Sequence, residues 1–488
     1  MARLGHVQYK YLVAVAFMLG LFMNILDTTI TNVALPDLSR EFNASTTSIQ
    51  WIVNGYLLSL AVFIPLSGWA GDRFGTKRVF IFALIVFTTG STLCGLAWSA
   101  ESLIGFRILQ GIGGGMLTPV GTAMMFRAFP PGERAKASAL VAIPAGVAPA
   151  LGPILGGYLV EYVSWHWIFF INVPVGIGGI IFSILYLQRG QQEDPGRLDI
   201  AGFLLSASGL ASLVYGLSEA GSRGLGDQRV VLFLIAGAVL LTAMVLVELR
   251  VARPMIDVRL FKDRLFAASS TVSLVAFSGL TGAIFLLPLL LQSELGLSPL
   301  QSGFAMFPQA LGMVALMPLA SRMYGRVGPR RMLMAGMAWV GLSTFGYCLV
   351  GIGTDLWQVG LLMMLRGLGF AMVIVPLQAA TFATISAKDT GRASAIFSSV
   401  QQVAGSLGVA ILGTILTNRL AHHGAQMGNP ATKGAAVLAF HEAFFVAGLF
   451  TLVGAAVAII ISDKAAAPSM NRAASTDAEG EPTPVLVH

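Results

Sequence analysis

Three charged residues lie well inside long apolar stretches of the sequence: Asp27, Arg107 and Arg366. Charge in apolar surroundings is costly, so such residues usually serve a function. A carboxyl group removed from water holds its proton more firmly, whereas a neighbouring arginine favours the ionised form. Asp27, with Arg107 as its partner, therefore has the chemistry of a proton carrier. The alternative for both residues is a purely structural ion pair, or a charge that faces a cavity without a role.

Other chemistries are not supported. The GIGGG stretch at 111–115 lies inside an apolar run and follows no strand, so we reject it as a nucleotide-binding loop. No GxxxxGK[ST] motif occurs, which argues against ATP-driven transport. His422 and His423 indicate a loop surface rather than a metal site, and Cys94 and Cys348 lie in apolar runs that predict no disulfide. We expect no enzyme activity, no metal site and no cofactor.

The composition indicates an integral membrane protein. The chain has 488 residues, of which 56% are hydrophobic and 11% charged, whereas soluble proteins carry about 25% charged residues. A mean hydropathy of +0.78 leaves too little polar surface for a water-soluble fold. The net charge of +7 fits the basic loops of a membrane protein, and no nucleic-acid partner is expected.

The apolar runs predict about fourteen transmembrane helices, since one crossing takes about 20 residues. The runs lie near 11–35, 47–70, 79–98, 102–126, 136–160, 166–188, 199–219, 230–249, 266–292, 299–321, 331–352, 356–385, 392–417 and 437–462. Basic residues gather in the loops on the side of the N-terminus. The exceptions outside the membrane are Arg40, Arg223, Arg229, Arg419 and Lys433. Both termini are therefore expected in the cytoplasm, in a multi-pass protein of the inner (plasma) membrane.

The predicted spans place Asp27 and Arg107 at one depth. Asp27 lies about 24 Å along the first span from its cytoplasmic end near Tyr11, at 1.5 Å per residue. Arg107 lies about 9 Å below the outer surface near Glu101 by the same rise. In a hydrocarbon core about 30 Å thick, both lie in the outer half, so they can be partners.

An internal repeat divides the chain. PLSGWAGDRFGTKRV begins at Pro65 and PLASRMYGRVGPRRM begins at Pro318, and the segment from Ala137 matches the one from Ala393. Arg107 likewise corresponds to Arg366. We therefore expect two six-helix halves with two inserted central helices. The predicted parts are an N-terminal half at 1–190, an inserted helix pair at 191–252, an amphipathic linker helix with the C-terminal half at 253–462, and a disordered cytoplasmic tail at 463–488.

Two motifs have residue types suited to conformational change. The loop after the second span combines glycines that permit a tight turn, an acid that can accept hydrogen bonds at a helix N-terminus, and basic residues that hold it in the cytoplasm. Its residues are Gly68, Asp72, Arg73, Gly75, Lys77 and Arg78. The fifth span carries a smooth, bendable face that predicts a hinge and a tight seal. Its residues are Gly146, Gly152, Pro153, Gly156 and Gly157. The alternatives are a plain topogenic loop and ordinary small-residue packing.

Large residues on spans expected to face the centre are candidates for a substrate cavity, because aromatics and methionines suit flat lipophilic cations. The candidates are Trp51, Asn54, Tyr56, Phe277, Phe285, Met306, Phe307, Gln309, Arg366, Gln401 and Gln402. The segment 252–264 alternates charged and apolar residues, which is typical of an amphipathic interfacial helix.

Five segments together resemble the fourteen-helix drug:proton antiporters of the major facilitator superfamily. LDTTITNVALP at 26–36 resembles their first-helix signature, and GWAGDRFGTKR at 68–78 the superfamily's loop signature. RILQGIGGG at 107–115 is similar to the fourth-helix motif, and GVAPALGPILGG at 146–157 to the antiporter motif. WHWIFFINVP at 165–174 resembles a segment typical of the fourteen-helix branch. The resemblance covers nearly the whole chain.

The resemblance implies an all-α integral membrane protein with the major facilitator fold. It also implies proton-driven efflux of amphipathic, cationic compounds, with Asp27 as the protonation site, Arg107 as its relay partner and the loop at 68–78 as a latch between the halves. Export of an endogenous lipid, siderophore or secondary metabolite by the same fold stays open. A non-transporting sensor or scaffold would not need Asp27 and Arg107. The expected partners are a small-molecule substrate, protons and the lipid bilayer. The chain is expected to work as a monomer, and the need for a periplasmic adaptor is left open.

Overall fold

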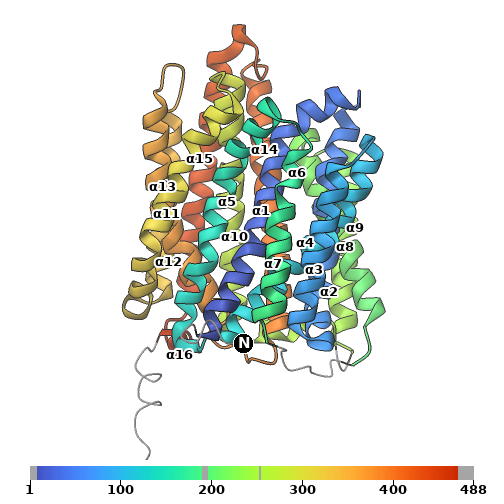
Figure 1. Ribbon diagram of the computed structural model, residues 1–488. Helices are drawn as coiled ribbons and strands as arrows, with labels where there is room; N and C mark the ends of the chain where they lie inside the picture. The colour runs from blue at the N-terminus through green and yellow to red at the C-terminus, as the bar shows by residue number, and fades with distance from the viewer. Residues whose placement is uncertain (1–7, 45, 189–195, 252–253, 471–488) are drawn as a thin grey trace, which may run out of the picture.

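The computed structural model describes residues 8–44, 46–188, 196–251 and 254–470. Within these ranges the chain is all-helical, and its long helices run lengthwise beside one another (Figure 1). Thirteen described segments are long and apolar enough to cross a membrane. A further helix, α4, is 29 residues long and packs against α2 and α3 within the bundle. The predicted all-α architecture of about fourteen spans is confirmed.

The long helices are α1 (Tyr9–Glu41), α2 (Thr46–Phe74), α3 (Thr76–Gly95), α4 (Ala100–Ala128), α5 (Arg134–Tyr162), α7 (Asn172–Tyr186), α8 (Ile200–Arg223), α9 (Gln228–Glu248), α10 (Arg264–Leu289), α11 (Pro299–Val327), α12 (Pro329–Phe345), α13 (Leu356–Thr381), α14 (Thr390–His422) and α15 (Lys433–Val457). The short elements that matter below are α6 (Trp167–Phe170), which leads directly into α7, the 3-10 helix η2 (Val258–Lys262) and α16 (Ala467–Met470).

The two copies of the sequence repeat turn in the same way. Gly75 precedes α3 with a φ of +86°, and Gly328 precedes α12 with a φ of +87°. Residues with a Cβ rarely adopt this backbone conformation, so glycine is required at both places. The six long helices from α1 to α7 and the six from α10 to α15 therefore have a matching turn before their third helix.

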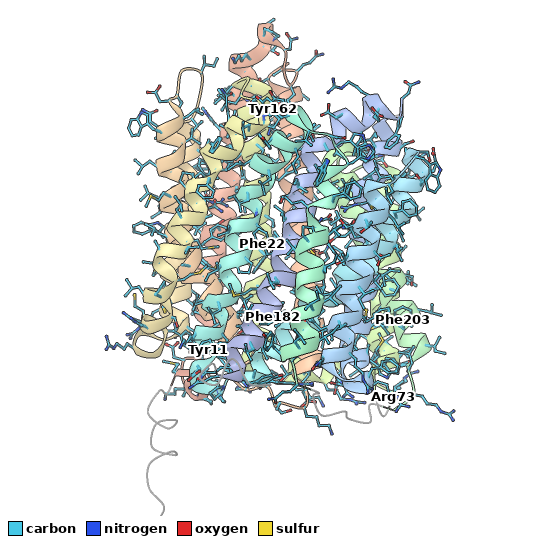
Figure 2. The ribbon with its side chains drawn as sticks, viewed as in Figure 1. Tyr11, Phe22, Arg73, Tyr162, Phe182 and Phe203 are labelled. Atoms are coloured by element: carbon cyan, nitrogen blue, oxygen red, sulfur yellow. The ribbon has the colours of Figure 1, made fainter. Side chains whose placement is uncertain are left out.

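Both described ends of the chain lie at one end of the bundle. The start of α1 and α16 are together at the lower end of Figure 1. Figure 2 shows Tyr11 and Arg73 at this end and Tyr162 at the opposite one. Tyrosines at both ends are typical of a membrane protein, since their rings are amphipathic and favour the two interfaces.

The two halves meet closely along α5 and α11. A Cβ at Gly303 of α11 would lie 3.0 Å from the backbone nitrogen of Ile154, and one at Gly157 of α5 would lie 3.3 Å from that of Leu300. A side chain at Gly146 would overlap the side chain of Met313. Small residues thus let backbones of different halves approach each other, as is common between helices in lipid.

The inserted pair, α8 and α9, contacts both halves. Trp51 of α2 stacks on Tyr215 of α8 with ring centres 5.7 Å apart. On the other side of α8, the hydroxyl of Thr414 in α14 donates to the carbonyl of Ala220 at 2.9 Å. A Cβ at Gly413 would lie 3.1 Å from the Cα of Gly221. α8 therefore bridges α2 of the first half and α14 of the second.

The prediction of an amphipathic linker helix at 252–264 is wrong for residues 254–264, which the structure describes. Residues 254–264 contain only the five-residue η2 and the first residue of α10. Asp257 accepts from the backbone nitrogen of Arg259 at 3.1 Å, and Asp263 accepts from that of Leu265 at 2.8 Å. Each aspartate begins a new helix, because its side chain satisfies the first free N–H groups. Residues 252–253 lie outside the described residues.

The prediction of a disordered tail at 463–488 is also wrong for residues 463–470. Asp463 accepts from the backbone nitrogen of Arg330 at 2.9 Å, at the start of α12. Ser469 is buried and lies 2.7 Å from the hydroxyl of Tyr324. α16 also contacts residues 131–133 and α5 of the N-terminal half. The residues up to Met470 are therefore packed against both halves, and 471–488 lie outside the described residues.

Candidate functional site

Asp27 of α1 is completely buried and accepts hydrogen bonds from three side chains. Its Oδ2 lies 2.5 Å from Nη1 of Arg107, and the two residues form an ion pair. Its Oδ1 accepts from Nε2 of Gln110 at 2.8 Å and from Nδ2 of Asn172 at 3.1 Å. An ionised carboxylate only accepts hydrogen bonds, so this set of donors suits the charged form of Asp27.

Arg107 is equally enclosed. Its Nη1 also donates to Oε1 of Gln110 at 2.8 Å, and its Nε donates to the carbonyl of Ile52 at 3.4 Å. The centre of the Tyr56 ring lies 4.1 Å from the guanidinium carbon, a cation–π contact. Tyr56 in turn donates its hydroxyl to Oδ1 of Asn24 at 3.0 Å. The site is a closed polar cluster made by α1, α2, α4 and α7.

Glycines of α4 allow the neighbouring helices to close around this cluster. A Cβ at Gly111 would lie 2.6 Å from the side chain of Ser59 on α2, and one at Gly113 would lie 2.5 Å from the carbonyl of Ala83 on α3. Arg107 and Gln110 are one turn apart, so both project from the same face of α4. The GIGGG run therefore serves helix packing, which brings α2 and its Tyr56 against Arg107.

The structure brings Asp27 and Arg107 together, as their equal depth predicts. Tyr56, a predicted cavity residue, lies against Arg107 and belongs to this cluster, and its contact with a substrate stays a prediction. Gln110 and Asn172, both fully or almost fully buried, are not among the residues predicted from the sequence. Gln110 could have been found, because it follows Arg107 by one helical turn and so lies on the same face of the helix. Nothing local marks Asn172.

The glycines of the predicted hinge lie between α1 and α11. A Cβ at Gly152 would lie 2.2 Å from Oγ1 of Thr29, two residues after Asp27 on α1. One at Gly156 would lie 3.0 Å from the side chain of Ile30. The contacts of Gly146 and Gly157 with α11 are described above, and a Cβ at Gly303 of α11 would lie 3.1 Å from the Cβ of Pro153. α5 therefore contacts the helix of Asp27 on one side and the C-terminal half on the other.

Asp72, at the end of α2, takes part in a contact between the halves. Its Oδ1 accepts from Nη2 of Arg127 at 3.0 Å. Arg127 also donates to the carbonyls of Ala387 at 3.0 Å and Lys388 at 3.3 Å, just before α14. Nε of Arg392 lies 3.9 Å from Oδ2 of Asp72. The N-terminus of α14 adds a favourable dipole to this anionic side chain.

The other residues of the loop have separate partners. A Cβ at Gly68 would lie 3.1 Å from the carbonyl of Gly391 in α14, a further close contact between the halves. Lys77 donates to the carbonyl of Ile184 at 2.8 Å and to that of Leu187, at the end of α7. Arg73 and Arg78 are exposed. The loop thus combines contacts within the N-terminal half with contacts across to α14.

Arg366 is the C-terminal counterpart of Arg107 and is buried to the same extent. Its Nη1 donates to Oε1 of Gln309 at 3.1 Å, and its Nη2 donates to the carbonyl of Leu280 at 3.1 Å. The rings of Phe370 and Tyr347 lie 5.0 and 6.0 Å from the guanidinium carbon. Its Nε has no hydrogen-bond partner, and no described residue forms an ion pair with it. Arg366 therefore keeps an uncompensated positive charge.

The remaining cavity candidates lie in several environments. Trp51 and Asn54 contact α8, where Ser218 donates to Oδ1 of Asn54 at 2.9 Å. Met306 is buried, whereas Phe285 is exposed on α10. The half-buried candidates are Phe277, Phe307, Gln401 and Gln402. Their contact with a substrate stays a prediction.

Known proteins share both the sequence pattern and the fold. A family described as Major Facilitator Superfamily matches residues 17–409 and 269–486. The chain is 34% identical over 413 residues to the Uncharacterized MFS-type transporter YhcA of Bacillus subtilis (strain 168), which covers 85% of this chain and 78% of that protein. It is 36% identical over 403 residues to the Multidrug resistance protein B homolog of Mycobacterium tuberculosis (strain ATCC 25618 / H37Rv), with 81% and 74% covered.

Solved structures agree at the level of the fold. The human organic anion transporter MFSD10 (TETRAN) superposes with a TM-score of 0.65 at 17% identity, over 92% of this chain and 99% of that one. The proton:xylose symporter XylE superposes with a TM-score of 0.60 at 14% identity, over 91% and 95%. The chain therefore belongs to the major facilitator superfamily and is a multi-pass membrane transporter rather than an enzyme.

Proposed function

We propose that this protein is an antiporter that uses the proton gradient to export amphipathic, cationic compounds across the cytoplasmic membrane. Its termini would face the cytoplasm. Relatives named for multidrug resistance support the export of drugs. The observation that carries the proposal is the buried cluster in which Asp27 faces Arg107, Gln110 and Asn172.

The cluster gives protonation a structural consequence. Ionised Asp27 compensates the charge of Arg107 and accepts from both amides. A proton on Asp27 removes the counter-charge and leaves a buried guanidinium without an ion-pair partner. Loss of one member of a buried pair costs about 3–5 kcal/mol. Protonation therefore destabilises this packing of α1, α4 and α7 and favours a different arrangement of the helices.

The helix contacts offer a path from this site to the other half. α1 contacts α5 through Thr29 and Gly152, two residues beyond Asp27. α5 contacts α11 through Gly157 and Leu300. Backbones in such close contact cannot shift independently, because packed helices have discrete rather than continuous arrangements. A movement of α1 on protonation is thus expected to displace α5 against the C-terminal half.

The decisive experiment replaces Asp27 with asparagine in protein reconstituted into liposomes. Ethidium, a flat lipophilic cation, serves as substrate, and a pH-sensitive dye reports protons. Asp27→Asn keeps the shape of the side chain but cannot change charge. It should abolish substrate-triggered proton release and uphill transport, while some ethidium binding survives. Asp37→Asn is the matched control, because Asp37 lies near the outer end of the same helix and pairs with Arg40.

The outcome decides between coupling and a structural ion pair. Undiminished proton release and uphill transport by a well-folded Asp27→Asn protein would exclude Asp27 as the proton carrier. Equal losses in Asp27→Asn and Asp37→Asn would show that any lost charge on α1 impairs the protein. Only a selective loss at Asp27 supports the proposal.

A further inference from the structure

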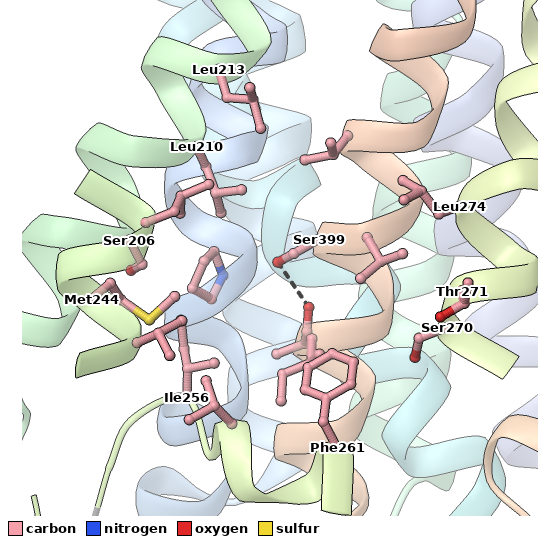
Figure 3. A pocket seen from close by; sticks show the side chains of 18 residues that line it. Ser206, Leu210, Leu213, Met244, Ile256, Phe261, Ser270, Thr271, Leu274 and Ser399 are labelled. Carbon is pink, nitrogen blue, oxygen red and sulfur yellow. Dashed lines mark hydrogen bonds between the residues drawn. The ribbon is translucent and has the colours of Figure 1, made fainter. Parts of the chain in front are cut away.

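A pocket lies between the inserted helix pair and the second half, next to η2 (Figure 3). Its volume is about 370 Å³. Leu210 and Met244 come from α8 and α9, Leu274 from α10, and Val403 from α14. Pocket volumes of about 300–1,000 Å³ are usual for small-molecule sites. None of the residues predicted to bind the exported substrate lines it.

The pocket is apolar and open at its edge. None of the described residues that line it is charged. Val245, Phe261 and Thr271 line it and are also exposed, so the pocket reaches the surface of the protein. Val245 and Thr271 belong to the spanning helices α9 and α10, so this surface faces lipid beside them. An occupant can enter sideways from the bilayer.

One lining hydroxyl lacks a partner. Ser206, Thr271 and Ser399 each donate to a carbonyl of their own helix at 3.0 Å. Ser270 lines the same pocket and is 3% exposed, yet its hydroxyl has no hydrogen-bond partner. Buried polar groups are nearly always paired, so an unpaired donor in an apolar pocket points to a ligand that brings an acceptor.

Basic residues surround the end of the pocket near η2. Lys262 follows the lining residue Phe261, Arg264 begins α10, and both are exposed. Arg250, just beyond α9, is exposed as well. The nearby acids are occupied: Asp257 and Asp263 are half-buried and accept from backbone nitrogens at the starts of η2 and α10, and the buried Glu248 accepts from the backbone nitrogen of Ile256 at 3.2 Å. The exposed charges next to η2 are therefore basic, which disfavours a cationic compound. An anionic headgroup with an apolar chain is complementary to both parts, because basic sites between spanning helices bind such headgroups.

We propose that this pocket holds an acyl chain of an anionic phospholipid from the leaflet on the side where α1 begins. The phosphate lies at Lys262 and Arg264, and Ser270 donates to an ester carbonyl of the lipid. The lipid then fills the space between the inserted pair and the C-terminal half. This site is independent of the proposed transport activity.

The test uses phosphatidylglycerol with a photoreactive diazirine in its acyl chain, added to phosphatidylcholine vesicles that contain the purified full-length protein. Irradiation should label peptides of α8, α10 and α14 around the pocket. Phosphatidylcholine with the same diazirine should label them far less. Loss of two basic residues near a membrane surface, in Lys262→Gln/Arg264→Gln, should weaken phosphatidylglycerol labelling about tenfold or more. Arg330→Gln/Arg331→Gln, two exposed residues at the start of α12, is the matched control.

A second variant tests the pocket itself. Ser399→Trp places an indole in the cavity and should remove the labelling. Val239→Trp is the control, because Val239 is exposed on α9 and does not line the pocket. Equal labelling by both lipids, labelling unchanged by Ser399→Trp, or displacement of the label by ethidium would each overturn the proposal. The last result would assign the pocket to the exported substrate instead. The surface charge variants keep the proposal testable if Ser399→Trp does not fold.

Discussion

The two halves contain equivalent buried arginines in unequal surroundings. Arg107 faces the carboxylate of Asp27 at 2.5 Å. Arg366 faces the amide oxygen of Gln309 and the carbonyl of Leu280, both at 3.1 Å. Pro65 and Pro318 are equivalent positions of the sequence repeat. Asp27 and Leu280 are separated by the same number of residues as these two prolines, and so are Tyr56 and Gln309. The second copy thus has a main-chain carbonyl at the place of the acid and an amide at the place of the aromatic ring.

Because of this difference, the two halves differ in whether proton binding can change the charge beside the buried arginine. Only the N-terminal site contains a group that can change charge when it binds a proton. The C-terminal site keeps a fixed positive charge, because arginine stays protonated in proteins. Arg366 can contact a substrate through an acceptor group, but it repels a cation. Coupling is therefore expected in the first half, and the second half is expected to respond through helix contacts.

The largest expected effect separates the two arginines. Arg107→Gln leaves Asp27 buried without a counter-charge, so Asp27 should stay protonated and cease to cycle. Loss of one partner of a buried pair costs about 3–5 kcal/mol, so the thermal unfolding temperature should fall as well. Arg366→Gln breaks no ion pair among the described residues. It should alter the KM for ethidium while uphill transport and proton release persist. Equal loss of coupled transport in both variants would contradict the proposed asymmetry.

A smaller effect is expected at the contacts of α5. Gly152→Ala would place a Cβ 2.2 Å from Thr29 Oγ1 on the helix of Asp27, whereas Gly157→Ala would place one 3.3 Å from Leu300 on the other half. Overpacking costs about 1–3 kcal/mol, so Gly152→Ala should lower both the unfolding temperature and the transport rate. Gly157→Ala should have a weaker effect. Gly178→Ala is the control, since its Cβ meets nothing within 4 Å. A Gly152→Ala protein with normal transport would disprove the path through α5.

The smallest effect compares two acids at the equivalent loops: Asp72 lies in the first loop, and Asp463, which follows α15, contacts the second. Asp72 contacts Arg127 and approaches Arg392 of the other half, whereas Asp463 accepts only from Arg330 within its own half among the hydrogen bonds of the described chain. A partly exposed ion pair is worth up to about 1 kcal/mol, so Asp72→Asn should slow transport by a few fold. Asp463→Asn should leave the rate unchanged. Initial rates of ethidium export from cells with equal protein levels measure the difference. Identical rates in both variants would reduce the first loop to a topogenic role.

The site could be predicted only in part. Charge inside an apolar run is rare and costly, so Asp27 and Arg107 could be recognised and placed at one depth. Gln110 and Asn172 carry no charge, and uncharged amides are common in membrane helices that have no special role. Their function depends on α4 and α7 meeting at α1, which involves contacts between residues far apart in the chain. The contact of Tyr56 with Arg107 likewise depends on two helices far apart in the chain, because the residues on one helix face do not reveal which helix packs against it.

The segments 252–264 and 463–470 show a second limit of prediction from the sequence, which concerns weak local preferences. The alternating pattern at 252–264 is compatible with an amphipathic helix, but Asp257 and Asp263 cap separate helices. Composition suggested disorder after 463, yet Ser469 packs near Tyr324. In both cases a tertiary contact or a cap outweighs a weak local preference.

The sequence by itself determined the membrane class, the spans, the repeat and the pairing depth of Asp27 with Arg107. Hydropathy and the cost of buried charge act locally, so a single chain reveals them. The tertiary structure decided which groups surround each arginine, how α8 bridges the halves and where an apolar pocket opens to lipid. These features depend on how close two backbones can come, and that distance is set by small residues on both partners at once.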